Sequence, residues 1–178
     1  MTDLEIEKGC KQGDNKARKE LYIRYSGLMF ALIMRYVGDK EQSEDLLHDG
    51  FISVFGSFDK FVWRGEGSLR AWMSRLFVNV ALGWLRDKKD FEVSVDEIPE
   101  AEDDPEEPDV AQIPKELIMQ FITELPTGYR TVFNLYAIEG LQHKEIAKML
   151  NITERSSSSQ FFRAKKILAH RILSYLGK

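Results

Sequence analysis

Apolar side chains recur at helical spacing through most of this chain. Between residues 46 and 58 they lie mostly three or four positions apart, with acidic residues at 41, 44, 45 and 49, and a second stripe follows between residues 69 and 85. Spacing of this kind places apolar side chains on one face of a helix, so both segments are predicted to be helices with one buried face. The stripe positions are Leu46, Leu47, Phe51, Val54, Phe55 and Phe58, then Leu69, Trp72, Met73, Leu76, Phe77, Val80 and Leu85.

Residues 15–37 form a third helical pattern, rich in Leu, Ile, Met and Tyr. No segment alternates between apolar and polar residues for long enough to predict a β-strand. We therefore expect an all-α fold, with residues 1–88 as a small helical domain.

The C-terminal part divides into shorter predicted helices. Pro114 favours a helix start at that point, and Pro126 separates this helix from a second one, which ends near Gly140. A third helix is expected from Gln142 to Leu150, and a last one from Glu154 towards Tyr175.

The turn between these last two helices has only three residues. Asn151 tolerates the left-handed conformation that a sharp turn needs, and Thr153 is a suitable N-cap for the helix that follows. Two helices joined by a short turn, with the second one basic, predict a helix-turn-helix over part of a domain at 114–178.

Basic residues on the last helix favour DNA binding, because cations along one helix can neutralise phosphates. They are Arg155, Arg163, Lys165 and Lys166. The alternative is a solvated basic face near a helix C-terminus, which the helix dipole also favours. The four serines at 156–159 have two interpretations as well: hydroxyl donors to phosphates and bases, or a frayed first turn.

Charge is divided unevenly along the chain. Residues 90–114 contain 11 acidic side chains and no Lys or Arg, whereas residues 142–178 hold 8 basic and 2 acidic groups. Without the acidic stretch, the net charge would be +7 rather than −4. Four of the five prolines also fall in this stretch, so we interpret residues 89–113 as a flexible acidic linker between two domains.

Several classes of protein are disfavoured by the sequence. The single cysteine and the polar, acidic N-terminal segment favour a cytoplasmic protein without membrane insertion. No phosphate-binding GxxxxGK is present, and the three histidines lack a nucleophile or a set of metal ligands. We therefore expect no catalytic residues, no metal and no cofactor.

Four segments closely resemble the extracytoplasmic-function (ECF) sigma factors of bacterial RNA polymerase. LPTGYRTVF at 125–133 and EGLQHKEIAKML at 139–150, followed by Arg163-Ala-Lys, resemble the fourth conserved region of that family. EDLLHDGF at 44–51 is similar to its polymerase-docking helix, and FVWRGEGSLRAWMSRLFVNVA at 61–81 to its promoter-opening segment. The resemblance covers nearly the whole chain and implies a factor that binds core polymerase, recognises promoter DNA and promotes strand opening.

The resemblance implies that Asp45, His48 and Asp49 bind a coiled coil of the largest polymerase subunit. Relatives have Gln where His48 stands, and a histidine keeps hydrogen bonding but adds sensitivity to pH. A metal site at Glu44 and His48 is the alternative, although no further ligand has suitable spacing.

For promoter DNA, the resemblance implies two groups of residues. At the element near the start site, the loop at 63–68 captures a flipped base and the following helix contacts DNA; at the far element, the last helix reads the major groove. The near-element residues are Trp63, Arg64, Glu66, Ser68, Arg75, Asn79 and Arg86. The far-element residues are Arg155, Ser158, Ser159, Gln160, Phe162, Arg163 and Lys166.

A further protein partner, a role for the acidic linker and two alternative functions are also considered. The resemblance implies an anti-sigma protein as a further partner, and the acidic linker could lie across the basic C-terminal domain as a mimic of nucleic acid. Two other interpretations remain open: a helix-turn-helix regulator that binds DNA without polymerase, and a helical adaptor that contacts only proteins.

Overall fold

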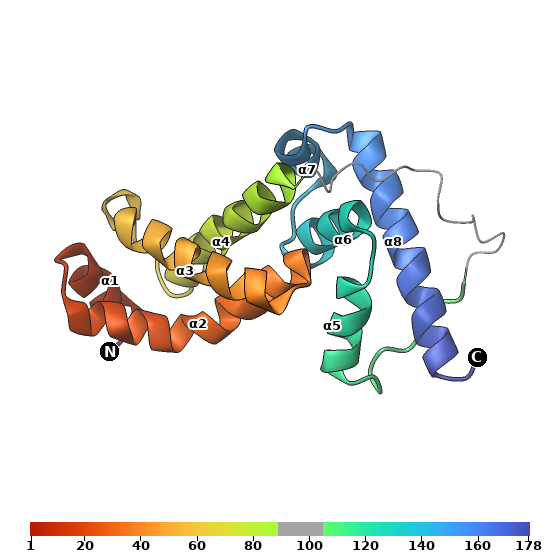
Figure 1. The fold of residues 1–178 in the computed structure, drawn as a ribbon, viewed down its shortest axis with the longest axis horizontal. Coiled ribbons are helices and arrows are strands. Elements are labelled where there is room, and N and C mark those ends of the chain that lie inside the picture. Colours follow the sequence, from red (N-terminus) through yellow and green to blue (C-terminus); the bar gives the residue numbers. More distant parts are fainter. Residues whose placement is uncertain (89–104) are drawn as a thin grey trace. The chain divides into compact units, whose positions relative to one another are not determined.

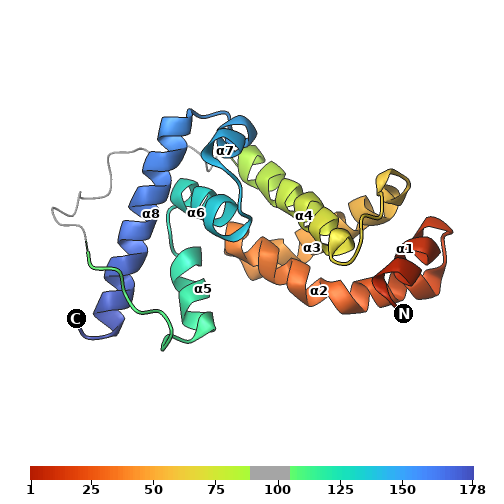
Figure 2. The same ribbon diagram turned by 180° about the vertical axis from the view of Figure 1, so that it is seen from behind.

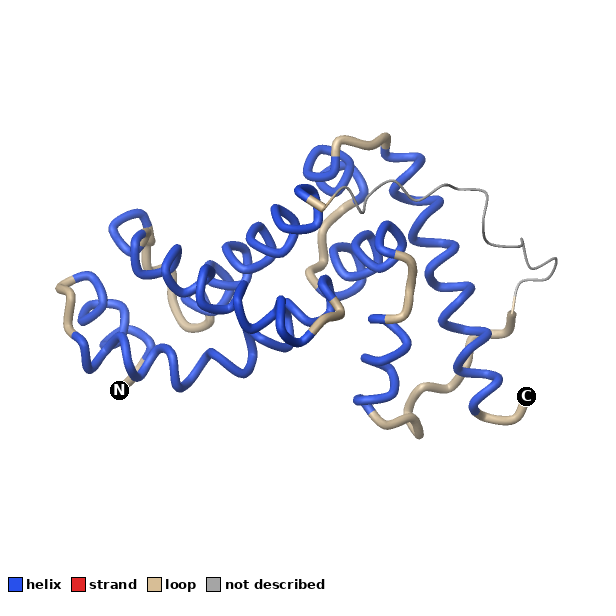
Figure 3. Tube along the Cα trace, viewed as in Figure 1, coloured by secondary structure: helices blue, strands red, loops and turns tan. Residues whose placement is uncertain are grey.

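The computed structural model describes residues 1–88 and 105–178, and in these residues it contains helices and loops but no strand (Figure 3). The predicted all-α fold is therefore confirmed for this part of the chain. The chain forms two compact units, residues 1–87 and 88–178. Most of the predicted acidic linker, residues 89–104, lies outside the described residues.

Unit 1 is built around one long helix, α2, with α1, α3 and α4 packed against it (Figures 1 and 2). Its elements are α1 (Asp3–Lys11), α2 (Asn15–Val37), α3 (Lys40–Gly56), the short 3₁₀ helix η1 (Phe58–Lys60) and α4 (Ser68–Asp87). The side chains of Asp14 and Asp39 cap α2 and α3 by accepting hydrogen bonds from Lys16 N and Gln42 N. These caps fix where each helix begins.

Helix α1 was not predicted from the apolar pattern. A capping box starts it: Thr2 Oγ1 accepts from Glu5 N, and the Glu5 carboxylate accepts from Thr2 N at 2.6 Å. The hydroxyl of Tyr25 on α2 donates to Asp3 at 2.6 Å, and burial together with this bond raises the pKa of Tyr25 to about 12. Helix α1 is thus held on α2 by polar contacts as well as by the buried Ile6 and Cys10.

Unit 2 contains the four predicted C-terminal helices, and α8 packs along the others. The elements are α5 (Lys115–Thr123), α6 (Thr127–Phe133), the π-helical turn η2 (Asn134–Ile138), α7 (His143–Leu150) and α8 (Glu154–Tyr175). The core joins Ile122 and Leu125 to Tyr129, Ala164 and Leu168. Arg130 donates to the carbonyl of Thr123 at 2.6 Å, which fixes the turn between α5 and α6.

A close approach between α3 and α4 depends on one glycine. A Cβ atom added at Gly50 would collide with the ring of Phe77, which is fully buried on α4. A Cβ atom added at Gly27, in the middle of α2, would lie in open space.

We expect Gly50→Ala to destabilise the protein by about 1–3 kcal/mol, because the added methyl overpacks a core with no room for it. Gly27→Ala is the matched control, and it should stabilise the protein by about 0.5–1 kcal/mol through better helix propensity. Urea denaturation of the full chain measures both. Equal effects of the two substitutions would contradict the assigned packing.

Candidate nucleic-acid interface

Helix α3 presents the three predicted docking residues on one outer face. Asp45, His48 and Asp49 are all exposed, at positions that one helical face brings together. The His48 Nδ1 atom lies 2.9 Å from the carbonyl oxygen of Glu44, so the ring is oriented by its own helix.

Ile52 extends this face by one turn, with 70% of its side chain exposed. It was not among the predicted docking residues, although its position seven residues after Asp45 is a readable signal. Ile52 thus adds an apolar side chain to the acidic face of α3.

The loop at 63–68 is fixed by the first side chain of α4. The hydroxyl of Ser68 donates to the carbonyl of Gly65 at 2.6 Å and accepts from Arg64 N at 3.3 Å. Gly65 and Gly67 both have positive φ, at 109° and 79°, which favours glycine at these positions. The loop thus has a defined shape that leaves Arg64 and Glu66 exposed and Trp63 half-buried.

Helix α4 directs its three predicted DNA residues to one side. Arg75, Asn79 and Arg86 are exposed. Asn79 and Arg86 lie 4 and 11 residues after Arg75, which is close to one and three full helical turns. Trp72 packs instead on Phe58 and Phe61, with ring centroids 5.2 and 4.8 Å away. This agrees with its position in the apolar stripe.

The predicted helix-turn-helix is formed by α7 and α8. Asn151 ends α7 in the left-handed conformation, with φ 54° and ψ 47°. Thr153 then caps α8, its hydroxyl accepting from Ser156 N at 3.0 Å. Both roles were predicted from the sequence and are confirmed.

The outer face of α8 brings together five of the seven predicted far-element residues. At 100° per residue they span a little more than a quarter of the helix circumference. They are Arg155, Ser158, Ser159, Phe162 and Lys166. Within the serine run, Ser157 differs from its neighbours because it is completely buried.

The other two residues point away from this face, Arg163 by about 40° and Gln160 by about 100° from its edge, and both contact the protein. The amide nitrogen of Gln160 donates to Ser156 Oγ at 3.1 Å, and Arg163 Nη1 donates to the hydroxyl of Tyr129 at 3.4 Å. In each side chain one donor is therefore engaged within unit 2.

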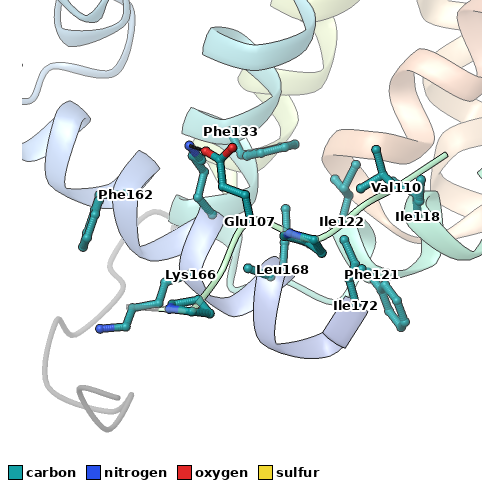
Figure 4. Close-up of a pocket in the computed structure, with 14 residues that line it drawn as sticks. Glu107, Val110, Ile118, Phe121, Ile122, Phe133, Phe162, Lys166, Leu168 and Ile172 are labelled. Atoms are coloured by element: carbon teal, nitrogen blue, oxygen red, sulfur yellow. Dashed lines mark ion pairs between the residues drawn. The ribbon is translucent and has the colours of Figure 1, made fainter. Parts of the chain in front are cut away.

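A cavity of about 500 Å³ lies beside the C-terminal half of this face (Figure 4). Apolar side chains of α5, α6 and α8 line it, and residues 105–110 cover part of it. Glu107 in this segment is 3.9 Å from Lys165 Nζ and is 94% exposed, so the ion pair alone stabilises the contact little. The acidic segment nevertheless lies next to Phe162 and Lys166, two predicted DNA residues.

The single cysteine is buried, and the potential metal ligands of the described residues are dispersed. In these two ranges no group of three or more His, Cys, Asp or Glu side chains could hold a metal ion. Burial raises the pKa of the Cys10 thiol to about 11, which disfavours the nucleophilic thiolate. No helix in residues 1–88 or 105–178 is long and apolar enough to cross a membrane.

Comparison with known families assigns both units. The sequence profile of sigma-70 region 2 matches residues 21–91, and that of sigma-70 region 4 matches residues 115–168. Together the two matches cover most of the chain.

Individual relatives are similar along nearly their whole length. The ECF RNA polymerase sigma-E factor of Haemophilus influenzae is 27% identical, over 97% of this chain and 96% of that protein. The RNA polymerase sigma-H factor of Pseudomonas aeruginosa is 26% identical, over 93% of this chain and 91% of that protein. A solved structure of CnrH in complex with the cytosolic domain of CnrY has the same fold, with a TM-score of 0.52, 21% identity and 97% of each chain covered.

A helical protein with a region-2 unit followed by a region-4 helix-turn-helix unit is a transcription initiation factor of the sigma-70 class. The chain belongs to this family as an ECF-type sigma factor. It therefore acts with core RNA polymerase on promoter DNA, in promoter recognition and initiation. The family assignment decides against the two alternatives, the polymerase-independent regulator and the helical adaptor.

The left-handed backbone conformation of Asn151 can be tested by substitution. We expect Asn151→Val to lower the free energy of unfolding by about 1–2 kcal/mol, because a β-branched residue is strained at positive φ. Asn151→Gly should leave it nearly unchanged, since glycine accepts this conformation. Chemical denaturation of the full chain compares the two variants, and equal stability would contradict the role given to this turn.

Proposed function

We propose that unit 1 docks on core polymerase through the outer face of α3, and that unit 2 binds the far promoter element through the outer face of α8. The observation that carries the proposal is the grouping of the candidate residues. Asp45, His48 and Asp49 share one exposed face of α3, and five of the seven far-element residues share the outer face of α8, where four are exposed and Lys166 is half-buried. In each case the opposite face of the helix is buried in its own unit.

The near promoter element is assigned to the 63–68 loop and α4. A base extruded from the duplex costs a few kcal/mol, so a preformed loop that receives it selects sequence while the strands separate. Trp63, Arg64 and Glu66 supply stacking and polar groups there. Arg75, Asn79 and Arg86 then hold the backbone along one side of α4. We therefore assign strand opening to unit 1.

An anti-sigma protein is proposed as a further partner. Support comes from CnrH, a protein of the same fold, whose solved structure contains the cytosolic domain of CnrY. We also propose that the chain acts in the cytoplasm with the polymerase, and that it has no catalytic activity, metal or cofactor of its own.

Reversal of one charge on α3 tests the docking assignment. Asp45→Arg should weaken core-polymerase binding by about tenfold or more, because it reverses a charge in the proposed interface, where the charges of two partners are complementary. Asp59→Arg is the matched control, since it makes the same charge change at an exposed acid of unit 1 that lies outside α3. Fluorescence-detected holoenzyme assembly measures both. If the two variants bind equally well, the α3 assignment is wrong.

The acidic segment before α5 generates a second prediction. Residues 105–109 carry three acidic groups and cover the cavity beside Lys165 and Lys166 on α8. Because these carboxylates compete with DNA phosphates for the same cations, neutralising them should strengthen DNA binding in the absence of polymerase. The variant combines Glu106→Gln, Glu107→Gln and Asp109→Asn.

Its control neutralises three exposed acids of unit 1, Glu41, Glu44 and Asp59, and changes the net charge equally. Fluorescence anisotropy with duplex DNA at several salt concentrations should give a several-fold larger gain for the segment variant. An equal gain in both variants would mean that only the net charge of the chain matters. The segment would then not compete with DNA for the basic residues of α8.

A further inference from the structure

Ser157 couples the two helices of the helix-turn-helix through a side-chain hydrogen bond. Its Oγ lies 2.8 Å from Nδ1 of His143, the first residue of α7. Ser157 is completely buried, so His143 supplies the partner that a buried hydroxyl requires. The bond therefore joins the start of α7 to the first turn of α8.

Ring packing fixes the orientation of the His143 side chain. The imidazole is stacked on Tyr136 of η2, with centroids 4.3 Å apart and an angle of 10° between the rings. Phe161 of α8 packs on Tyr136 at 4.4 Å and lies 5.9 Å from His143. Phe133 completes the cluster at 5.9 Å from Phe161. One side chain thus contacts two neighbouring elements, and two aromatic rings hold it in place.

The position of Ser157 matters because the two residues that follow it face outward. Ser158 and Ser159 are exposed directly after the buried Ser157. Successive helical residues differ by about 100° in direction, so the rotation of α8 that buries Ser157 also sets where both serines point. Recognition of base edges requires side chains held to within about 0.5 Å and 10–20°.

We propose that His143 is a positioning residue for promoter recognition. It sets the rotation of the first turns of α8 through Ser157, and thereby the sequence discrimination of Ser158 and Ser159, without reading a base itself. This inference rests on the proposed assignment of α8 to the far promoter element.

Three substitutions separate the hydrogen bond from the ring stack. His143→Phe keeps an aromatic ring against Tyr136 and removes the bond to Ser157. Ser157→Ala removes the same bond from the other side with a smaller change. His143→Asn keeps a hydrogen-bonding group but loses the stack. The double variant of His143→Phe with Ser157→Ala completes a cycle that isolates the pairwise interaction.

The measurement is binding of the reconstituted holoenzyme to two duplexes: a promoter fragment identified by transcript mapping, and the same fragment with its far element scrambled. His143→Phe and Ser157→Ala should each lower the ratio of the two affinities by about fivefold to tenfold, which is a loss in the range of one mismatched base pair. The salt dependence should stay unchanged, because the phosphate contacts remain. The double variant should lose little more than either single variant.

Other results would overturn the inference. An equal loss of affinity on both duplexes with a lower melting temperature would make His143 a stability residue only. An unchanged affinity ratio would remove the positioning role. A larger loss of discrimination in His143→Asn than in His143→Phe would assign positioning to the ring stack instead of the bond.

Ser158→Ala and Ser159→Ala distinguish failure of this inference from failure of the proposed function. If both leave discrimination unchanged, α8 does not read the far element through these serines, and the proposed function is wrong at this point. If either lowers discrimination while His143→Phe does not, only the positioning role is wrong.

Discussion

The packing of α8 against α5 and α6 is the interaction on which the DNA-binding unit depends. Ala164, Leu168 and Ile172 are buried on one side of α8, against a core that includes Ile122, Leu125 and Tyr129. Burial of a leucine or isoleucine side chain contributes roughly 1.5–3 kcal/mol to stability, more than a surface ion pair does. Because this face is held, the opposite face has a fixed direction and can present polar groups to a partner.

In unit 1, helices α3 and α4 likewise each have a buried face that fixes the direction of the opposite, exposed face. The inner sides of α3 and α4 meet at Gly50 and Phe77, where the backbone approaches an aromatic ring without a side chain between them. The outer side of α3 carries acidic groups, and the outer side of α4 carries Arg75, Asn79 and Arg86. These two surfaces differ in charge, which suits a protein partner for the first and nucleic acid for the second.

The sequence predicted much of the fold because its local signals were strong. Pro114, Pro126 and Thr153 lie where helices begin, and Asn151 occupies the left-handed turn that its residue type favours. Helix α1 was missed because it is short and polar, although the Thr2–Glu5 capping box is visible in the sequence. The π-helical turn η2 has no comparable local signal.

The candidate site was predictable as a set of positions, but not as a set of contacts. Spacing and family resemblance indicated which helix faces carry polar residues. The resemblance named Ser158 and Ser159 and not Ser157, but it did not indicate that Ser157 is buried and bonded to His143, because that contact depends on the packing of α7. Nor did they indicate that Gln160 and Arg163 bind other side chains of unit 2, or that Glu107 lies beside Lys165. The contacts of Arg163 and Glu107 join residues far apart in the sequence, so no local pattern encodes them, whereas the Gln160–Ser156 bond spans four residues, a spacing at which helical side chains meet.

We propose that the two units recognise two promoter elements together with core polymerase. Run-off transcription from fragmented genomic DNA of the source organism, with its core polymerase and with or without this chain, tests this proposal. We expect new transcripts that start downstream of two shared sequence elements at constant spacing. Transcripts that share only one element, or none beyond those made by core polymerase alone, would contradict it.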